Sequence, residues 1–187
     1  MPESKQITLK NVRLSYPNLF QAKSFVNADG KPTEPKFSAV FLLDKKKHSD
    51  AIKKIEAEVE KTALEFFKKK VPLKHNPLRD GVEKEDKDGY GPEVMFVSAS
   101  SKRRPQVVDR NPQIPLVETD GRPYAGCYVN AVVSFWAFDH KLGGKGVSVN
   151  LLAIQFVRDG EPFGETVNVE EAFDNEEAEE SDEDPLG

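Results

Sequence analysis

The chain has 187 residues with 27 Lys or Arg, 32 Asp or Glu and a formal net charge of -5, a length that suits one domain with an appendage. Its single cysteine, Cys127, excludes an intramolecular disulfide and a zinc site built from several thiolates. No run of residues approaches the ~20 apolar positions of a membrane span and the first residues lack the layout of a signal peptide, so we expect a soluble protein of a reducing compartment with no membrane partner.

Two strands are predicted in the N-terminal part of the chain. Residues 5–16 alternate apolar and polar side chains in two registers, and the change of parity near Lys10 and Asn11 predicts a bulge in a strongly curved sheet. Residues 36–44 place apolar side chains on one face of a second strand. The segment between them is rich in turn-forming residues, with Asp29 and Gly30 at its tip.

One helix is predicted from about Ser49, which suits the N-cap position, to Lys70. Apolar residues recur at helical spacing on one face of this segment, and they are Ile52, Ile55, Val59, Ala63 and Phe66. A long polar loop punctuated by proline and glycine, residues 71–92, follows the helix.

Three further strands are predicted after this loop, at residues 93–101, 125–138 and 145–158, and the last two suit a hairpin. About five strands, with one helix between the second and the third, favour a small curved barrel over a sandwich. The fold class predicted is therefore mainly β, a five-stranded OB-fold Greek-key barrel with one α-helix and long loops.

The C-terminal segment differs sharply in charge from the rest of the chain. Residues 169–187 contain ten acidic and no basic residues, so residues 1–168 hold 22 acidic against 27 basic residues and carry a net charge of +5. Like charges at this density repel, and the segment has little apolar surface to bury, so we expect a disordered acidic tail attached to a body of residues 1–168. Two roles stay open for the tail, a solubilising one and competition for whatever anion the basic body binds.

No catalytic, metal or cofactor motif is found in the sequence. The three histidines, His48, His75 and His140, lie in separate polar segments without metal-ligand spacing. The acidic residues within 83–88 lack the register of a calcium loop, and Cys127 lies in an apolar run typical of a core residue. We therefore expect a protein that is not an enzyme and requires no cofactor and no metal.

The strand predicted at 125–138 carries an unusual outer face. One parity is uniformly apolar and should face the core, whereas the other includes Tyr128, Trp136 and Phe138 among polar residues. Aromatic platforms of this kind stack unpaired nucleic-acid bases at ~1–3 kcal/mol each. The alternative is that these rings pack under the helix, against a loop or at a contact between two copies of the chain, and both interpretations stay open.

Basic residues that could contact phosphates gather just upstream of this strand. They are Lys102, Arg103, Arg104, Arg110 and Arg122. Short basic runs are common in proteins, so their position beside the aromatic strand is the more informative observation.

Five sequence segments of the body resemble the sequences of one phage family. These segments are PLRDG (77–81), SASSKRRPQVVDRNPQIPL (98–116), YAGCYVNAVVSFWAF (124–138), GKGVSVNLLAIQFVRDGEPFG (144–164) and KNVRLSYPNLF (10–20). The family was first catalogued as a domain of unknown function and is linked to phage single-stranded DNA-binding proteins. The resemblance implies an OB-fold, similar to the replication protein with which short-tailed phages coat single strands, and an acidic tail that regulates binding or recruits partners. In several single-stranded DNA-binding families, the acidic tail ends in an aromatic residue that docks into replication partners. In this chain the tail residue with an aromatic ring is Phe173, well inside the tail, so docking through a terminal aromatic residue is not supported.

Residues and resemblance together predict a sequence-nonspecific single-stranded DNA-binding protein that coats and protects DNA in phage replication or recombination, in the cytoplasm of the infected host. Bases would stack on some of the aromatic residues, and Ser100 and Ser101 would donate hydrogen bonds to the DNA backbone. The predicted interface is Ser100, Ser101, Lys102, Arg103, Arg104, Arg110, Arg122, Tyr124, Tyr128, Trp136 and Phe138. Replication or recombination proteins are the expected partners of the tail.

Two other classes of function stay open. An adaptor or DNA-mimic protein would act through the acidic tail and use the body only as a scaffold. A nuclease would need a divalent metal ion, for which the carboxylates within 83–88 are the only sequence indication.

Overall fold

The computed structural model describes residues 6–24, 26 and 30–164 of the chain. These residues form seven strands, one α-helix and two short 3-10 helices. In chain order they are β1 (Ile7–Lys23), β2 (Lys36–Asp44), α1 (Ser49–Phe67), β3 (Leu78–Asp80), η1 (Gly81–Lys84), β4 (Val94–Ser101), β5 (Gln106–Val108), η2 (Glu118–Asp120), β6 (Tyr128–His140) and β7 (Gly144–Arg158).

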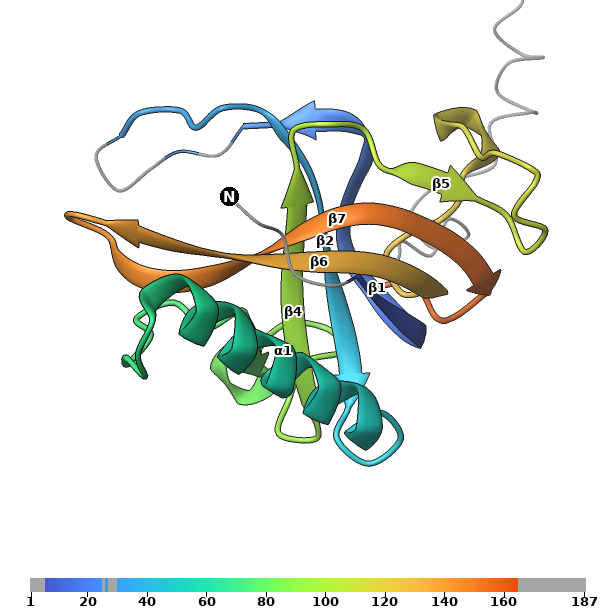
Figure 1. Cartoon of the computed structure of the whole chain (residues 1–187). Coiled ribbons are helices and arrows are strands. Elements are labelled where there is room, and N and C mark those ends of the chain that lie inside the picture. The colour runs from blue at the N-terminus through green and yellow to red at the C-terminus, as the bar shows by residue number, and fades with distance from the viewer. Residues whose placement is uncertain (1–5, 25, 27–29, 165–187) are drawn as a thin grey trace, which may run out of the picture.

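Five of the strands close into a barrel (Figure 1). Strand β1 pairs antiparallel with β2 and β6, β2 with β4, and β6 with β7. A parallel pairing between β4 and β7, at Ser100 and Asn150, completes the closure. The predicted five-stranded barrel, with its helix between the second and third barrel strands, is confirmed. The short strands β3 and β5 were not predicted, and they extend the sheet beside β4 and β7.

The bulge predicted in β1 lies where the parity changes. The register against β6 shifts between Leu9 and Val12, and Asn11 adopts a φ of 52°. The backbone N–H of Asn11 donates to Oδ1 of Asn130 at 2.8 Å, so a side chain replaces the lost ladder bond. The extra residue lets Leu9, Val12 and Leu14 all face the core.

The helix differs from the prediction at both ends. His48 occupies the N-cap position without a side-chain cap, and Ser49 is the first helical residue. The imidazole of His48 accepts the N–H of Asp44 instead and contacts the Asn11 carbonyl oxygen at 3.0 Å, so it joins the start of α1 to β1 and β2. The helix ends at Phe67 because Lys68 turns into the left-handed region, with a φ of 62°.

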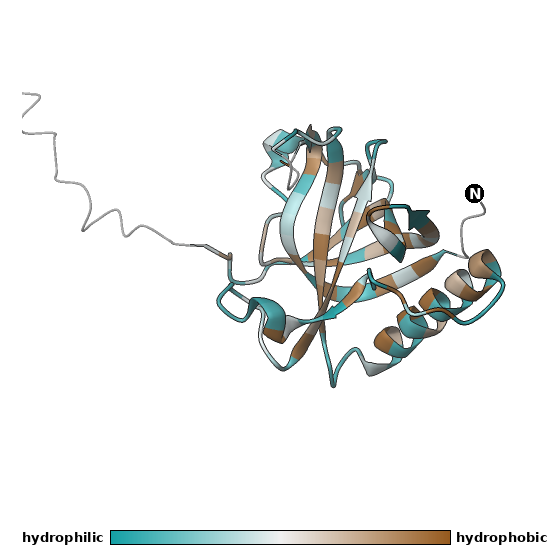
Figure 2. Cartoon of the chain, turned by 90° about the vertical axis from the view of Figure 1, so that its left-hand side faces the viewer, coloured by the Kyte–Doolittle hydropathy of each residue, from teal (hydrophilic) through white to brown (hydrophobic). Residues whose placement is uncertain are grey.

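The core lies inside the barrel and beneath α1, which packs against β6 and β7 (Figure 1). Helix residues Ile55 and Val59 are buried there, whereas Phe66, on the predicted apolar face, is 36% exposed. Figure 2 shows apolar residues along the strands and polar residues on the connecting loops. Cys127 is fully buried, and burial raises the pKa of its thiol to about 11, so its interpretation as a core residue is confirmed.

The part of the chain that the structure describes contains no helix long and apolar enough to cross a membrane. The predicted tail, residues 169–187, and its boundary with the body lie outside the described residues.

Candidate nucleic-acid interface

Four rings gather on the outer side of the β6–β7 hairpin, three of them around that of Phe138. Trp136 and Phe138 alternate with core residues of β6 and are absent from the core cluster, so both point outward. The ring of Phe138 lies 5.6 Å from that of Trp136, 4.8 Å from that of His140 and 5.8 Å from that of His75, centre to centre. We call these four side chains the ring row.

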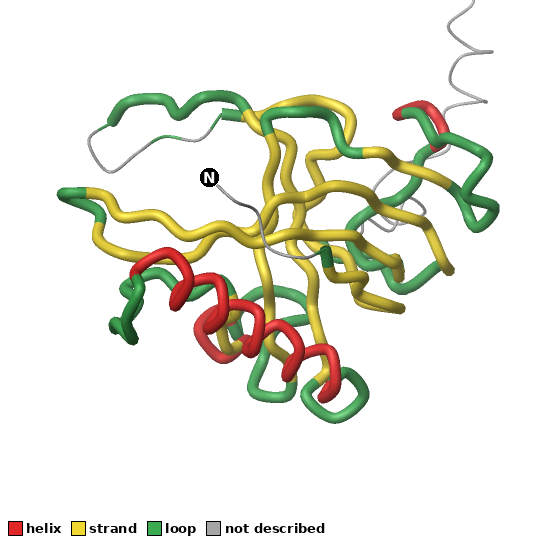
Figure 3. The backbone as a smooth tube through the Cα atoms, in the orientation of Figure 1, coloured by secondary structure: helices red, strands yellow, loops and turns green. Residues whose placement is uncertain are grey.

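The hairpin that carries the ring row is braced by the segment before β3. Backbone N–H groups of Lys74 and His75 donate to the carbonyl oxygen of Lys145, at 2.9 and 3.2 Å, and the His75 imidazole contacts the Gly143 carbonyl at 2.7 Å. A Cβ on Gly146 would come within 2.5 Å of the Phe138 ring, so glycine at this position lets the ring lie across β7. These contacts hold the rings in place on a hairpin that extends beyond the barrel (Figure 3).

A groove crosses the outer face of β2 and β4 and leads toward the ring row. Two hollows, of about 520 and 690 Å³, share Ser98 and Ser100 of β4 at their border. The first is also lined by Tyr16, Lys23, Ser38, Val40 and Lys84, and the second by Lys74, His75 and Ser148. Ser148 pairs with Trp136 in the sheet, which connects the second hollow to the ring row. We call the two hollows together the barrel groove.

Tyr16 is a groove residue that sequence reasoning treated only as part of an alternating strand. Its side chain is 51% exposed, and its φ of 44° lies in a region that bulky residues rarely adopt. The ring of Tyr90 lies 6.5 Å away. Backbone strain of this kind gathers at binding sites, and the following proline, Pro17, is the signal in the sequence that the alternation breaks here.

The predicted basic run follows β4 directly, two residues after the groove residue Ser100, and none of its three residues lines either hollow. Lys102 forms an ion pair with Glu34 at 3.1 Å, and Arg104 donates to the Phe20 carbonyl oxygen at 3.3 Å. The backbone N–H of Arg103 donates to Oγ of Ser101 at 3.0 Å. All three basic side chains are exposed. Residues 30–35 of the β1–β2 connection, which include Glu34, lie on the same side of the barrel as the β6–β7 turn (Figure 3).

Three predicted interface residues lie elsewhere, around β5 and the end of β7. Arg122 donates to Asp109 at 2.7 Å, and this hydrogen bond lowers the pKa of the carboxyl group. Arg110 donates to the Val157 carbonyl oxygen at 2.7 Å, and the Tyr124 hydroxyl donates to Asp159 at 2.7 Å. The first bond lies within the loops before β6, and the other two connect these loops to the end of β7. None of the three residues lines the barrel groove.

Tyr128 shares the outward parity of Trp136 but lies at the opposite end of β6. Eight residues of strand separate the two rings by about 26 Å. The Tyr128 ring is flanked by two guanidinium groups, with Cζ of Arg158 at 3.8 Å and Cζ of Arg13 at 5.8 Å from its centre. Of the four aromatic residues predicted to stack, the structure therefore brings only Trp136 and Phe138 together.

The acidic loop is held by protein groups. Glu83 pairs with Arg79 at 3.0 Å, and Asp88 accepts the backbone N–H of Gly164 at 2.8 Å. Among the described residues, no group of three or more His, Cys, Asp or Glu side chains could hold a metal ion.

Comparison with known proteins decides the family. A family model described as Enterobacter phage Enc34, ssDNA-binding protein, matches residues 5–184. The chain belongs to this family. The resemblance stated from the sequence is thereby confirmed.

Relatives of the Enc34 family align along most of the chain. Protein p50 of Acyrthosiphon pisum secondary endosymbiont phage 1 is 42% identical over an alignment of 189 positions, gaps included, that covers 95% of this chain and 97% of that protein. The single-stranded DNA-binding protein from bacteriophage Enc34, solved in complex with ssDNA, is 30% identical with a TM-score of 0.73, over 85% of this chain and 89% of that one. A C-terminal truncation of the Enc34 protein is 28% identical with a TM-score of 0.72, over 84% and 88% of the two chains.

Proposed function

We propose that this chain binds single-stranded DNA in the barrel groove, without strong sequence preference, and protects it during phage replication or recombination. The observation that carries the proposal is the ring row, three side chains of one hairpin face and one from the bracing segment, placed at the end of the barrel groove. Membership of the Enc34 family supports it, since the Enc34 protein itself has been solved in complex with ssDNA.

Bases and backbone would be held by different parts of the groove. Trp136 and Phe138 offer outward ring faces, on which any base can stack because every base has a π-face. Small hydroxyl side chains along the middle of the groove, such as Ser100, leave room for a strand and can donate to phosphates. Lys102 and the two arginines after it would contact phosphates at the rim.

The remaining predicted residues take other roles in this proposal. Arg110, Arg122 and Tyr124 stabilise the loops before β6 through the bonds described above. Tyr16 takes the place of Tyr124 as a stacking surface, because it is exposed and lines the groove.

Salt dependence tests the phosphate contacts. Affinity for oligo-dT should fall with salt at a log–log slope of about -0.7 for each phosphate contacted, which gives about -2 if Lys102, Arg103 and Arg104 contact one phosphate each. Replacing Arg103 with Gln should reduce the slope by about 0.7, whereas Lys53→Gln on the exposed side of α1 is a matched control that should not change it. Binding that does not depend on salt would contradict the proposal.

The acidic tail would oppose DNA binding. Its ten carboxylates follow a body of net charge +5 in the sequence, so the tail should lower the positive potential that attracts DNA. A variant that ends at residue 168 should bind oligo-dT several-fold more tightly, most visibly at low salt, where screening is weakest. Equal affinity of the two chains in fluorescence titrations would leave the tail only a solubilising or partner-recruiting role.

A further inference from the structure

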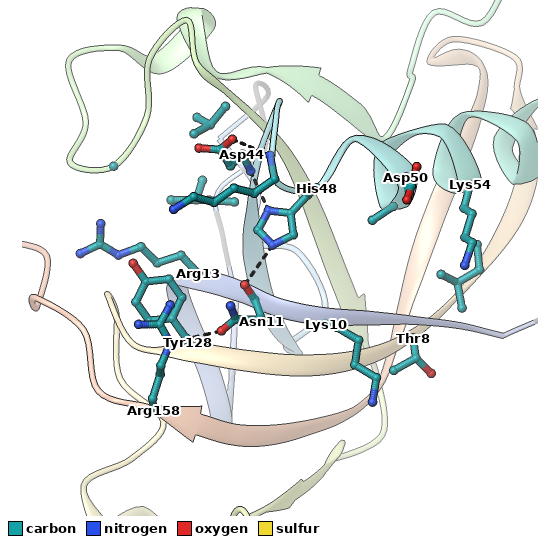
Figure 4. A pocket seen from close by; sticks show the side chains of 16 residues that line it. Thr8, Lys10, Asn11, Arg13, Asp44, His48, Asp50, Lys54, Tyr128 and Arg158 are labelled. Atoms are coloured by element: carbon teal, nitrogen blue, oxygen red, sulfur yellow. Dashed lines mark hydrogen bonds between the residues drawn. The ribbon is translucent and has the colours of Figure 1, made fainter.

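A second pocket, of about 540 Å³, lies between β1, the start of α1 and the start of β6 (Figure 4). It shares no lining residue with the barrel groove. Five cationic side chains line it, and they are Lys10, Arg13, Lys47, Lys54 and Arg158. Figure 4 shows Arg13, Tyr128 and Arg158 on one side of His48 and Lys10 and Lys54 on the other. We call this the basic pocket.

The two arginines of the basic pocket are held by neutral groups. Arg13 donates to the carbonyl oxygens of Gly126 and Glu161, at 3.0 and 2.7 Å, and Arg158 donates to the Asn11 side chain at 3.3 Å. None of the five pairs with a carboxylate within 4.0 Å in the described part of the chain.

Among the described residues, two carboxylates line the basic pocket, those of Asp44 and Asp50. The Asp44 carboxylate already accepts the backbone N–H groups of Lys46 and Lys47, at 2.8 and 2.9 Å. Five cations against two carboxylates leave a net charge of +3 in a concave site whose arginines are fixed in position. Such a site is ready to receive an anionic ligand, and guanidinium groups suit carboxylates because they can bind them with two hydrogen bonds.

The described chain ends beside this pocket. The ring of Phe163 lies 4.2 Å from Cζ of Arg13, and the Gly164 N–H is bound by Asp88. Gly89, which lines the pocket, is in close contact with the same ring. The ten tail carboxylates begin at Glu170, six residues after Gly164, and six residues of extended chain span up to ~20 Å.

We propose that the acidic tail of the same chain, residues 170–184, docks in the basic pocket. Its carboxylates pair there with Arg13, Arg158 and the surrounding lysines. A tethered segment reaches an effective concentration of order millimolar at such a site, so even weak individual ion pairs keep it docked at low salt. This inference deepens the tail's proposed regulatory role, because it gives the tail a docking site away from the DNA groove.

Disulfide trapping in the full-length chain tests the docking site without DNA. Lys10→Cys places a thiol in the basic pocket, and Ser98→Cys places one in the barrel groove as the matched control. Each is combined with Asn175→Cys in the tail. The native Cys127 is fully buried and stays unreactive. Under mild oxidation at low salt, we expect the Lys10→Cys pair to close an intramolecular disulfide at least ten-fold faster than the Ser98→Cys pair, as read by mass spectrometry of digested protein.

Other outcomes would overturn the proposal. Faster closure by the Ser98→Cys pair would place the tail in the barrel groove. Disulfides between two chains would identify the tail of a second copy as the occupant. Equally slow rates for the two pairs would mean that no docking occurs. Replacing the ten tail acids with Gln or Asn should remove the rate difference, and a difference that survives would contradict recognition by charge. Because coupling between two binding events is reciprocal, a short oligo-dT should slow closure at Lys10 by no more than the several-fold gain in DNA affinity expected on tail removal, and closure abolished by saturating oligo-dT would make the pocket a DNA site. The closure rates measured without DNA do not depend on whether the chain binds DNA. A negative result in the trapping experiment would therefore contradict the docking site but not the proposed function.

Discussion

Replacing Trp136 with alanine should weaken oligo-dT binding by about 1–3 kcal/mol, or about 5- to 150-fold. The ring lies on the outward face of β6, 5.6 Å from the ring of Phe138, at the point where the barrel groove reaches the hairpin. Alanine removes one stacking surface and leaves the phosphate contacts in place, so the salt slope should not change. Fluorescence-anisotropy titrations at several salt concentrations measure both quantities.

Val132→Ala is the matched control for this substitution. Val132 lies on the same face of the same strand and carries no ring, so its replacement should leave DNA affinity unchanged. Denaturation in urea shows whether each variant is folded. Full affinity in a folded Trp136→Ala protein would mean that the ring does not contact bases, and the ring row would then lose its proposed role.

Replacing Phe135 with alanine should lower the free energy of unfolding by about 3–5 kcal/mol. Phe135 is the neighbour of Trp136 in β6, but its side chain points into the barrel and is fully buried. Its removal takes a large apolar surface out of the core and leaves a cavity that the closed barrel can fill only in part. Urea denaturation followed by circular dichroism measures the loss.

Comparison of these two neighbours tests how β6 is oriented. Trp136→Ala should cost clearly less stability than Phe135→Ala, because the Trp136 ring is partly exposed and lies outside the core cluster. Equal losses in the two variants would show that the Trp136 side chain is packed as a core residue. In that case the alternation on which the ring row depends would be wrong.

The barrel could be predicted from the sequence because its signals are local. Alternation with a period of two identifies each long strand, and the parity change at Lys10 and Asn11 reveals the bulge in β1. The same alternation separates Phe135 from Trp136. The end of the helix was missed because nothing in the lysine-rich segment after Phe67 signals the left-handed turn at Lys68.

The groove could not be predicted because its parts are distant in the sequence. Tyr16, Ser98 and Ser148 come together only when β1, β4 and β7 take their places in the closed barrel. Arg122 follows the basic run closely in sequence, yet the loop that contains it folds back along β7 through the parallel pairing of β5. Residues that are close along the chain were therefore predicted to share one interface, but the fold places them apart.

Photo-crosslinking of oligo-dT to the full-length chain tests the site of DNA binding most directly. After irradiation and tryptic digestion, tandem mass spectrometry locates the residue that carries nucleotide, because one tryptic peptide contains Tyr124, Tyr128 and Trp136. We expect crosslinks at Trp136 and Tyr16, and their loss when salt is raised. Crosslinks confined to Tyr124 and Tyr128, or none at any salt concentration, would contradict binding in the barrel groove.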